Sequence, residues 1–320
     1  MGSVQEVYPP GIHVPCLTWF KSDPIQSIDW EVQERHLEFL VRSDLHGIVI
    51  AGTNGEAATL TSGEKSKLLR LTRSTAQKLG CPNLPITCGT FGGCTQAIIE
   101  DTKLAAEAGA DYALVLVPSY FHFALDEAAI IGFFQEVASA SPIPIMIYNF
   151  PGVASGLNVT SEMLETLGEH PNIAAVKLTC GSIASVARSA AKFGRALDDS
   201  PAFVALAGQS DWLVPCLSVG GAGSITGLAN LYPKTCVKLF NLYNAGNTAE
   251  AEQLQLQVAV AEWGFAKGGI NGTKWVVAKY LGYPEESSWC RRPYPKFVDE
   301  EKRTWVKKQV KGAEKIENGL

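Results

Sequence analysis

A lysine inside an apolar segment is the first residue of this sequence that could do chemistry. Lys177 stands within residues 173–179, among isoleucine, alanine, valine and leucine. Burial in such surroundings disfavours the charged form of an amine, and a neutral amine in a dry pocket is the nucleophile that forms a Schiff base with a carbonyl group. A lysine that extends its ammonium to solvent, or that forms a buried ion pair, would explain the same position without catalysis.

A tyrosine and a glycine-rich turn could complete such a site. Tyr148 lies near the end of the apolar run 144–150, one strand-and-helix unit before Lys177. A phenol beside an amine can exchange protons during imine formation, although a buried tyrosine is commonly a core residue. The turn Gly-Thr-Asn-Gly-Glu at residues 52–56 follows another apolar run, and its hydroxyl and amides could hold a carboxylate. A plain tight turn explains it about as well.

The elements that must position these residues form a repeating pattern. Short apolar runs alternate with segments of helical periodicity, and several of the runs are apolar at every position, which is typical of parallel strands buried on both faces. Eight such units in about 245 residues predict a (β/α)8 barrel, with an open doubly wound sheet as the alternative. The expected strands are 11–18, 47–51, 85–90, 112–117, 144–150, 173–179, 203–207 and 223–226.

The last part of the chain has a different character. Residues 234–244, 248–265 and 272–282 have helical patterns with no strand between them, and a charged helix is expected near 299–315. The sequence therefore predicts a barrel catalytic domain over 1–232 and a helical extension over 233–320. In a barrel the active site lies at the carboxyl ends of the strands, so Lys177 and Tyr148 should meet at one rim.

Three motifs resemble the dihydrodipicolinate synthase / N-acetylneuraminate lyase family of class I aldolases. They are the turn at 52–56, the Tyr-Asn-Phe-Pro stretch that begins at Tyr148, with Gly156 after it, and the Val-Lys-Leu-Thr strand that contains Lys177. They occur in the family's order, and the resemblance covers nearly the whole chain. It implies a (β/α)8 barrel with a helical extension, a homo-oligomer built as a dimer of dimers, and no metal or organic cofactor.

The resemblance also implies a catalytic role for four residues. Lys177 matches the family's Schiff-base lysine and Tyr148 its proton-relay tyrosine. Thr53 matches the hydroxyl that links the relay tyrosine to a second tyrosine, which reaches in from a neighbouring subunit. Tyr120 stands at the place of that second tyrosine.

Three further positions are implied to bind substrate together with Thr53. Asn54 stands where the family commonly has a threonine or serine that helps to bind the carboxylate of the 2-keto acid. Gly208 and Ile225, at the ends of the seventh and eighth strands, fall where the family lines the pocket.

One departure from the family narrows the expected activity. Dihydrodipicolinate synthases carry an arginine shortly after the Tyr-Asn-x-Pro motif, whereas residues 152–156 read Gly-Val-Ala-Ser-Gly. These side chains cannot replace a bidentate guanidinium. The chain is most similar to fungal-type aldolases that cleave 2-keto-3-deoxy sugar acids or 4-hydroxy-2-oxoglutarate. A hydro-lyase or condensing enzyme that uses the same imine, and a catalytically silent keto-acid-binding protein, are the alternatives.

Composition limits the partners and the location. A net charge of −5 and a pI near 5.6 argue against nucleic acid as a partner. The sequence has no apolar run of the ~18–20 residues that span a bilayer, and residues 1–6 lack the features of a signal peptide. We therefore expect a cytoplasmic protein whose partner is a small 2-keto acid.

Overall fold

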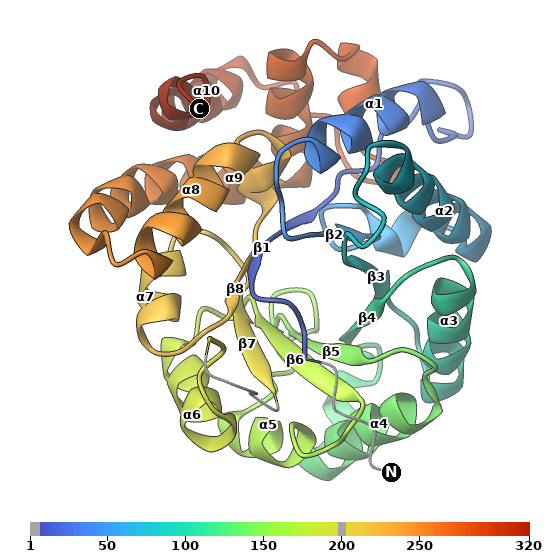
Figure 1. Cartoon of the computed structure of the whole chain (residues 1–320). Coiled ribbons are helices and arrows are strands. Elements are labelled where there is room, and N and C mark those ends of the chain that lie inside the picture. Colours follow the sequence, from blue (N-terminus) through green and yellow to red (C-terminus); the bar gives the residue numbers. More distant parts are fainter. Residues whose placement is uncertain (1–6, 198–202) are drawn as a thin grey trace.

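A closed barrel of parallel strands forms the centre of the computed structural model, which describes residues 7–197 and 203–320. Within these residues eight strands pair in sequence order, and β8 pairs with β1 (Figure 1). This closure confirms the predicted (β/α)8 barrel and rules out an open sheet. The strands are β1 (Gly11–Pro15), β2 (Gly47–Ile50), β3 (Ile86–Thr90), β4 (Tyr112–Leu116), β5 (Ile145–Asn149), β6 (Ile173–Leu178), β7 (Val204–Ala207) and β8 (Gly223–Ile225).

Helices surround the barrel, and each follows one strand (Figure 1). Several of them begin where the sequence has a capping residue. Asp29 and Asp126 each accept a hydrogen bond from a backbone N–H of the first turn, and Thr61 and Glu64 form a reciprocal capping box. These helices are α1 (Trp30–Val41), α2 (Ser62–Lys78), α3 (Thr95–Glu107), α4 (Glu127–Ala140), α5 (Ser161–Leu167), α6 (Ile183–Phe193) and α7 (Leu213–Ser218).

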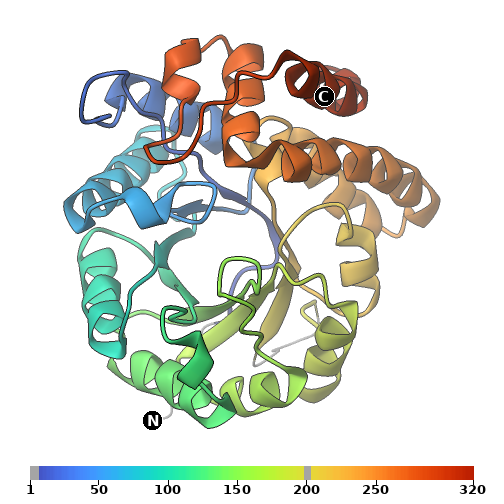
Figure 2. The same cartoon turned by 180° about the vertical axis from the view of Figure 1, so that it is seen from behind.

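The C-terminal part is helical, as predicted. It contains α8 (Pro233–Asn244), α9 (Thr248–Leu281) and α10 (Glu300–Glu317). The two helices expected over 248–265 and 272–282 form one long helix with a break at Gly269, whose φ of 68° and ψ of −174° are not helical. Helices α9 and α10 pack side by side (Figure 2). The division of the chain at residue 232 stays a prediction.

Side chains of successive strand residues alternate between two environments. Tyr112, Leu114 and Tyr148 belong to a cluster inside the barrel, whereas Ala113 and Ile147 pack against the surrounding helices. Both environments are apolar, which explains why the strand sequences show no alternation of polar and apolar residues.

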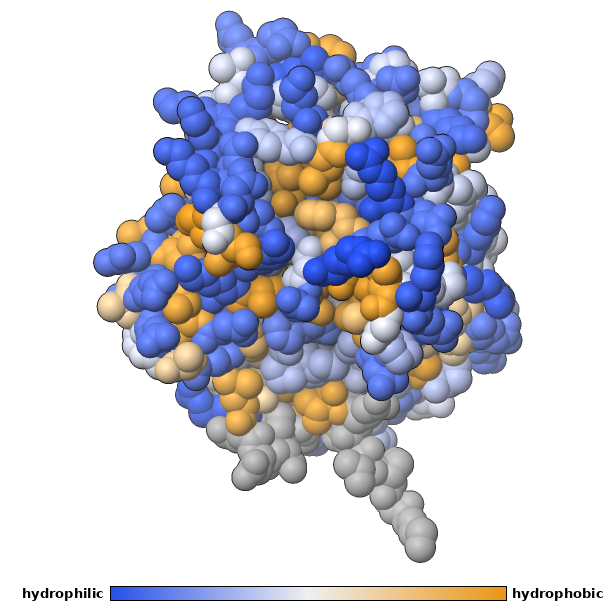
Figure 3. Space-filling model, turned by 45° about the horizontal axis from the view of Figure 1, so that its top comes forward, coloured by the Kyte–Doolittle hydropathy of each residue, from blue (hydrophilic) through white to orange (hydrophobic). Residues whose placement is uncertain are grey.

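The outer surface is mixed in character. Hydrophobic side chains are visible in patches between hydrophilic ones when the top of the molecule is turned forward (Figure 3). No helix in the described part of the chain is long and apolar enough to cross a membrane. Residues 1–6, on which the expectation about a signal peptide rests, lie outside the described residues.

Candidate active site

Lys177 and Tyr148 lie side by side at the carboxyl ends of β6 and β5. The two residues are directly paired in the parallel register, and the Nζ atom of Lys177 lies 4.5 Å from the centroid of the Tyr148 ring. Both are buried, with 4% and 2% of their surfaces exposed. None of the ion pairs found within the described residues involves Lys177. Lys177 is therefore neither a solvent-facing lysine nor one partner of a structural salt bridge.

The turn after β2 brings a hydroxyl to this pair. Thr53 Oγ1 is hydrogen-bonded to the hydroxyl of Tyr148 at 3.1 Å. The turn is closed by the backbone N–H of Glu56, which donates to the carbonyl of Thr53 at 3.0 Å. The Thr18 hydroxyl donates to the carbonyl of Gly55 at 2.7 Å. These bonds hold the Thr53 side chain toward β5.

A buried ion pair anchors the end of the same turn. Glu56 has a left-handed backbone with φ of 56°, which is uncommon for a residue with a side chain. Its carboxylate accepts a hydrogen bond from Lys274 Nζ at 2.7 Å and another from the backbone N–H of Arg291 at 2.8 Å. The side chains of Lys274 and Glu56 are 0% and 2% exposed. The turn at 52–56 is thus tied to α9 and to the segment that follows it, a connection that the sequence did not reveal.

Lys177, Tyr148 and Thr53 line one cavity with a volume of about 280 Å³. Asn54 and Gly208 line it as well, as the resemblance implies. Two glycines allow side chains to approach closely there. A Cβ atom on Gly227 would lie 2.5 Å from Asn54 Nδ2, and one on Gly208 would lie 2.1 Å from the hydroxyl oxygen of Thr179. The positions of Asn54 and Thr179 at the cavity wall therefore depend on the lack of a side chain at Gly227 and Gly208.

Two of the predicted site residues lie elsewhere. Ile225 is fully buried in the barrel interior and does not line the cavity. Tyr120 lies after β4, is 80% exposed and packs edge-on against Phe121 at a ring separation of 5.0 Å. The structure thus brings Lys177, Tyr148, Thr53, Asn54 and Gly208 together, and leaves Tyr120 on the outer surface of the single chain.

The loop after β5 forms another part of the cavity wall. Asn149 fixes the loop, because its side-chain amide accepts a hydrogen bond from the backbone N–H of Val159 and donates to Asn158 Oδ1. Phe150 and Val153 line the cavity. Val153 lies in the stretch 152–156, which contains no arginine, so an apolar side chain borders the cavity here.

Helix α9 supplies a wall that the sequence analysis missed. Its lining residues surround the helix break, where Gly269 itself faces the cavity. Glu262 is the one acidic residue among the described residues that line the cavity, and only 4% of its surface is exposed. A glutamate at a position that shares the helical spacing of the apolar residues Val258, Ala261 and Phe265 was the available signal. The lining residues from α9 are Glu262, Phe265, Ala266, Gly269, Ile270 and Thr273.

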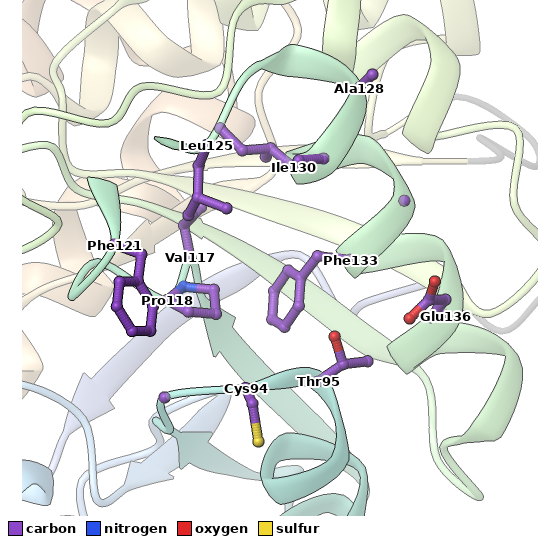
Figure 4. A pocket seen from close by; sticks show the side chains of 13 residues that line it. Cys94, Thr95, Val117, Pro118, Phe121, Leu125, Ala128, Ile130, Phe133 and Glu136 are labelled. Carbon is purple, nitrogen blue, oxygen red and sulfur yellow. The ribbon is translucent and has the colours of Figure 1, made fainter. Parts of the chain in front are cut away.

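A second cavity, of about 420 Å³, lies between α3 and α4 (Figure 4). Its lining is mainly apolar and includes Val117, Phe121 and Phe133, with Cys94 at one edge. None of the predicted site residues lines it. In residues 7–197 and 203–320, no group of three or more histidine, cysteine, aspartate or glutamate side chains could hold a metal ion.

The fold and this site together define a (β/α)8-barrel protein with a buried lysine and tyrosine at the carboxyl end of the barrel. The chain belongs to the dihydrodipicolinate synthetase family, whose model matches residues 9–313. This confirms the family predicted from the three motifs.

Relatives in fungi are similar over most of the chain. An L-threo-3-deoxy-hexylosonate aldolase from Hypocrea jecorina is 37% identical over 314 residues, which is 98% of each chain. A protein of Emericella nidulans named "Probable 4-hydroxy-2-oxoglutarate aldolase, mitochondrial" is 39% identical over 284 residues, 89% of this chain and 88% of that one. The prediction of a lyase of this family is confirmed.

A solved structure agrees with the fold. The crystal structure of a dihydrodipicolinate synthase family protein from Coccidioides immitis is 37% identical, with a TM-score of 0.87 over 99% of this chain and 100% of that one.

Proposed function

We propose that this protein is a Schiff-base aldolase that cleaves a 2-keto acid, with Lys177 as the nucleophile. The observation that carries the proposal is the position of Lys177 Nζ, buried 4.5 Å from the ring of Tyr148 in a cavity that both residues line. The candidate substrates are 2-keto-3-deoxy sugar acids and 4-hydroxy-2-oxoglutarate, because relatives with 37–39% identity bear these names. The products are pyruvate plus an aldehyde, which is glyoxylate when the substrate is 4-hydroxy-2-oxoglutarate.

The reaction begins when the amine of Lys177 attacks the keto carbon. Tyr148 moves protons as the carbinolamine loses water and becomes a cationic imine. The hydroxyl at C4 then gives its proton to Tyr148, and the electrons of the C3–C4 bond move into the imine to form an enamine. The aldehyde leaves, the enamine takes up a proton at C3, and water releases pyruvate and the free lysine.

The other site residues support these steps. Thr53 holds the Tyr148 hydroxyl through the 3.1 Å hydrogen bond and so fixes the phenol toward the reacting carbon. Asn54 and Gly208 line the cavity where the carboxylate of the keto acid would be bound. Tyr120 would complete the proton relay only from a second copy of the chain, since it is 80% exposed in this one. A homo-oligomer is therefore part of the proposal, and so is a cytoplasmic location.

Val153 favours cleavage over condensation. A condensing enzyme of the dihydrodipicolinate synthase type must bind the carboxylate of a second substrate, and Val153 at the cavity wall offers that group no hydrogen bond. A hydro-lyase that expels hydroxide from the same enamine is the remaining enzymatic candidate, and analysis of the products for pyruvate distinguishes the two.

Borohydride trapping tests the proposal. Reduction in the presence of pyruvate should leave a mass adduct on Lys177, and Lys177→Arg should abolish both the adduct and pyruvate release, because a guanidinium cannot become a neutral amine. Lys103→Arg, at an exposed position of α3, is the matched control and should behave as the wild type. A wild-type protein without the adduct would refute the Schiff-base mechanism and favour a silent keto-acid-binding protein.

A further inference from the structure

Glu262 is a buried carboxyl group in the cavity that the proposed mechanism does not use. It lies on α9, whereas the residues assigned to the reaction lie at the ends of strands or directly after them. An unused carboxyl group in an active-site cavity is a candidate for substrate recognition, because burying it without a role costs free energy.

One oxygen of this carboxyl group is held by the protein. Glu262 Oε2 accepts a hydrogen bond from the backbone N–H of Ser210 at 3.1 Å and from the hydroxyl of Thr226 at 2.5 Å, and the Ser210 hydroxyl also donates to it. Ser210 and Thr226 are themselves fully buried. These donors fix the orientation of the side chain.

The other oxygen has no partner among the described residues. All three of these hydrogen bonds end on Oε2, and the Oε1 atom of Glu262 accepts none from the described residues. This atom is also not fully enclosed by the described part of the protein. Since Glu262 lines the cavity, Oε1 is the free acceptor there.

The charges around the cavity limit what this acceptor can meet. Lys177 and Glu262 are the only lysine, arginine, histidine, aspartate or glutamate among the described residues that line it. Once Lys177 has formed an imine with the keto carbon, no cationic side chain is left in the described lining for a second carboxylate. A carboxylate at the far end of the substrate would instead face Glu262, whereas a hydroxyl could donate to Oε1.

We propose that Glu262 determines specificity by accepting a hydrogen bond from a hydroxyl of the substrate beyond C4, so that the preferred substrate is a polyhydroxylated 2-keto-3-deoxy acid and not a dicarboxylate. The inference rests on the proposed function only in placing the keto carbon at Lys177. Gln209 and Thr273, which also line the cavity, offer further polar groups to a polyhydroxylated chain. The cavity volume of about 280 Å³ is near the lower end of common ligand sites, which suits a six-carbon acid.

The test compares a 2-keto-3-deoxyhexonate with 4-hydroxy-2-oxoglutarate. Pyruvate release by the wild type should favour the hexonate by at least tenfold in kcat/KM. In Glu262→Gln the amide oxygen can keep the three donors at Oε2, so the free position becomes an N–H donor in place of an acceptor. The selectivity ratio should then fall at least tenfold, through a higher KM for the hexonate, while the pyruvate adduct on Lys177 still forms.

The matched control is Glu252→Gln, at an exposed position of the same helix, which should keep the wild-type ratio. A ratio within threefold of the wild type in folded Glu262→Gln, or a wild-type preference for the dicarboxylate, would overturn the inference. The preference of the wild type is measured without any variant, so this outcome does not depend on whether Glu262→Gln folds.

Binding separates this inference from the proposed function. Calorimetry on Lys177→Ala compares the dissociation constants of the two uncleaved acids, with no imine needed. Tighter binding of the hexonate supports the role of Glu262 even if borohydride finds no adduct in the wild type. Equal or weaker binding of the hexonate refutes that role even if the adduct forms.

Discussion

Tyr148 and Lys177 are paired across β5 and β6 because β6 contains one extra residue near its start. Ile145 pairs with Ile173, but the next residue of β5, Met146, pairs with Ala175, so the register shifts by one there. Side chains alternate along a strand, and Ile173 packs against the helices. Without the irregularity, Lys177 would face the helices as Ile173 does, and the shift turns it into the barrel beside Tyr148.

The hydrogen bond between Thr53 and Tyr148 predicts a graded loss of activity. Tyr148→Phe removes the proton-transferring hydroxyl and should lower kcat by about 10²–10⁴-fold. Thr53→Val keeps the phenol but removes its 3.1 Å partner, so the loss should be smaller. Steady-state pyruvate release, with borohydride trapping on each variant, gives both values.

In both variants some adduct should still form on Lys177. Tyr243→Phe, a partly buried tyrosine on α8, is the control and should keep the wild-type rate. Full activity in Tyr148→Phe would show that the phenol transfers no essential proton.

The buried pair of Lys274 and Glu56 predicts a large effect on stability. Lys274→Met leaves the Glu56 carboxylate buried without its cation and should lower the free energy of unfolding by about 3–5 kcal/mol. The double variant with Glu56→Gln should recover part of that loss, because a neutral amide can still accept from the backbone N–H of Arg291. Urea unfolding measures each free energy.

Lys279→Met, at an exposed position on the same helix, should change stability by less than about 0.5 kcal/mol. If Lys274→Met unfolds at the same urea concentration as this control, the pair does not stabilise the turn at 52–56.

A buried histidine predicts that acid destabilises the fold. His36 Nε2 donates to Asn230 Oδ1, and in the neutral ring the other nitrogen, Nδ1, accepts from the Tyr283 hydroxyl at 3.3 Å. Burial lowers the pKa of His36 from 6.5 to about 4. The unfolded chain therefore binds a proton near pH 6.5 that the native state binds only near pH 4, and stability present above pH 6.5 is lost as the pH falls toward 4.

Between pH 7 and pH 5 this histidine should remove roughly 2 kcal/mol from the free energy of unfolding. Urea unfolding of His36→Gln at the two pH values should show a loss smaller than the wild type's by about that amount. Burial also lowers the pKa of His13 to about 3, so His13 causes a similar loss in the free energy of unfolding. That loss remains in His36→Gln. The control His122→Gln, at an exposed position, should lose as much free energy of unfolding between the two pH values as the wild type. If His36→Gln also loses as much as the wild type, His36 is not a source of the acid sensitivity.

The alternation of strands and helices, several helix caps and the strand ends that carry the site could all be predicted from the amino-acid sequence, with a (β/α)8 barrel as the favoured fold. Unbroken apolar runs such as 112–117 are typical of strands covered on both faces, and eight strand-like runs alternating with helices leave few folds open. A lysine in one of those runs was conspicuous because charge is costly in such surroundings. The turn at 52–56 was located by its glycines and its place after an apolar run, and Tyr148 by its place near the end of another run.

The direction in which Lys177 points, and the residues around it, could not be predicted from the sequence and are seen in the folded chain. Where both faces of a strand are apolar, the sequence carries no signal for facing, and the register shift at Ala175 is a property of paired backbones. Glu262 and Lys274 lie 85 and 97 residues after Lys177, on a helix whose place over the cavity depends on long-range packing. Local periodicity predicts such a helix but does not predict which residues its buried polar side chains contact.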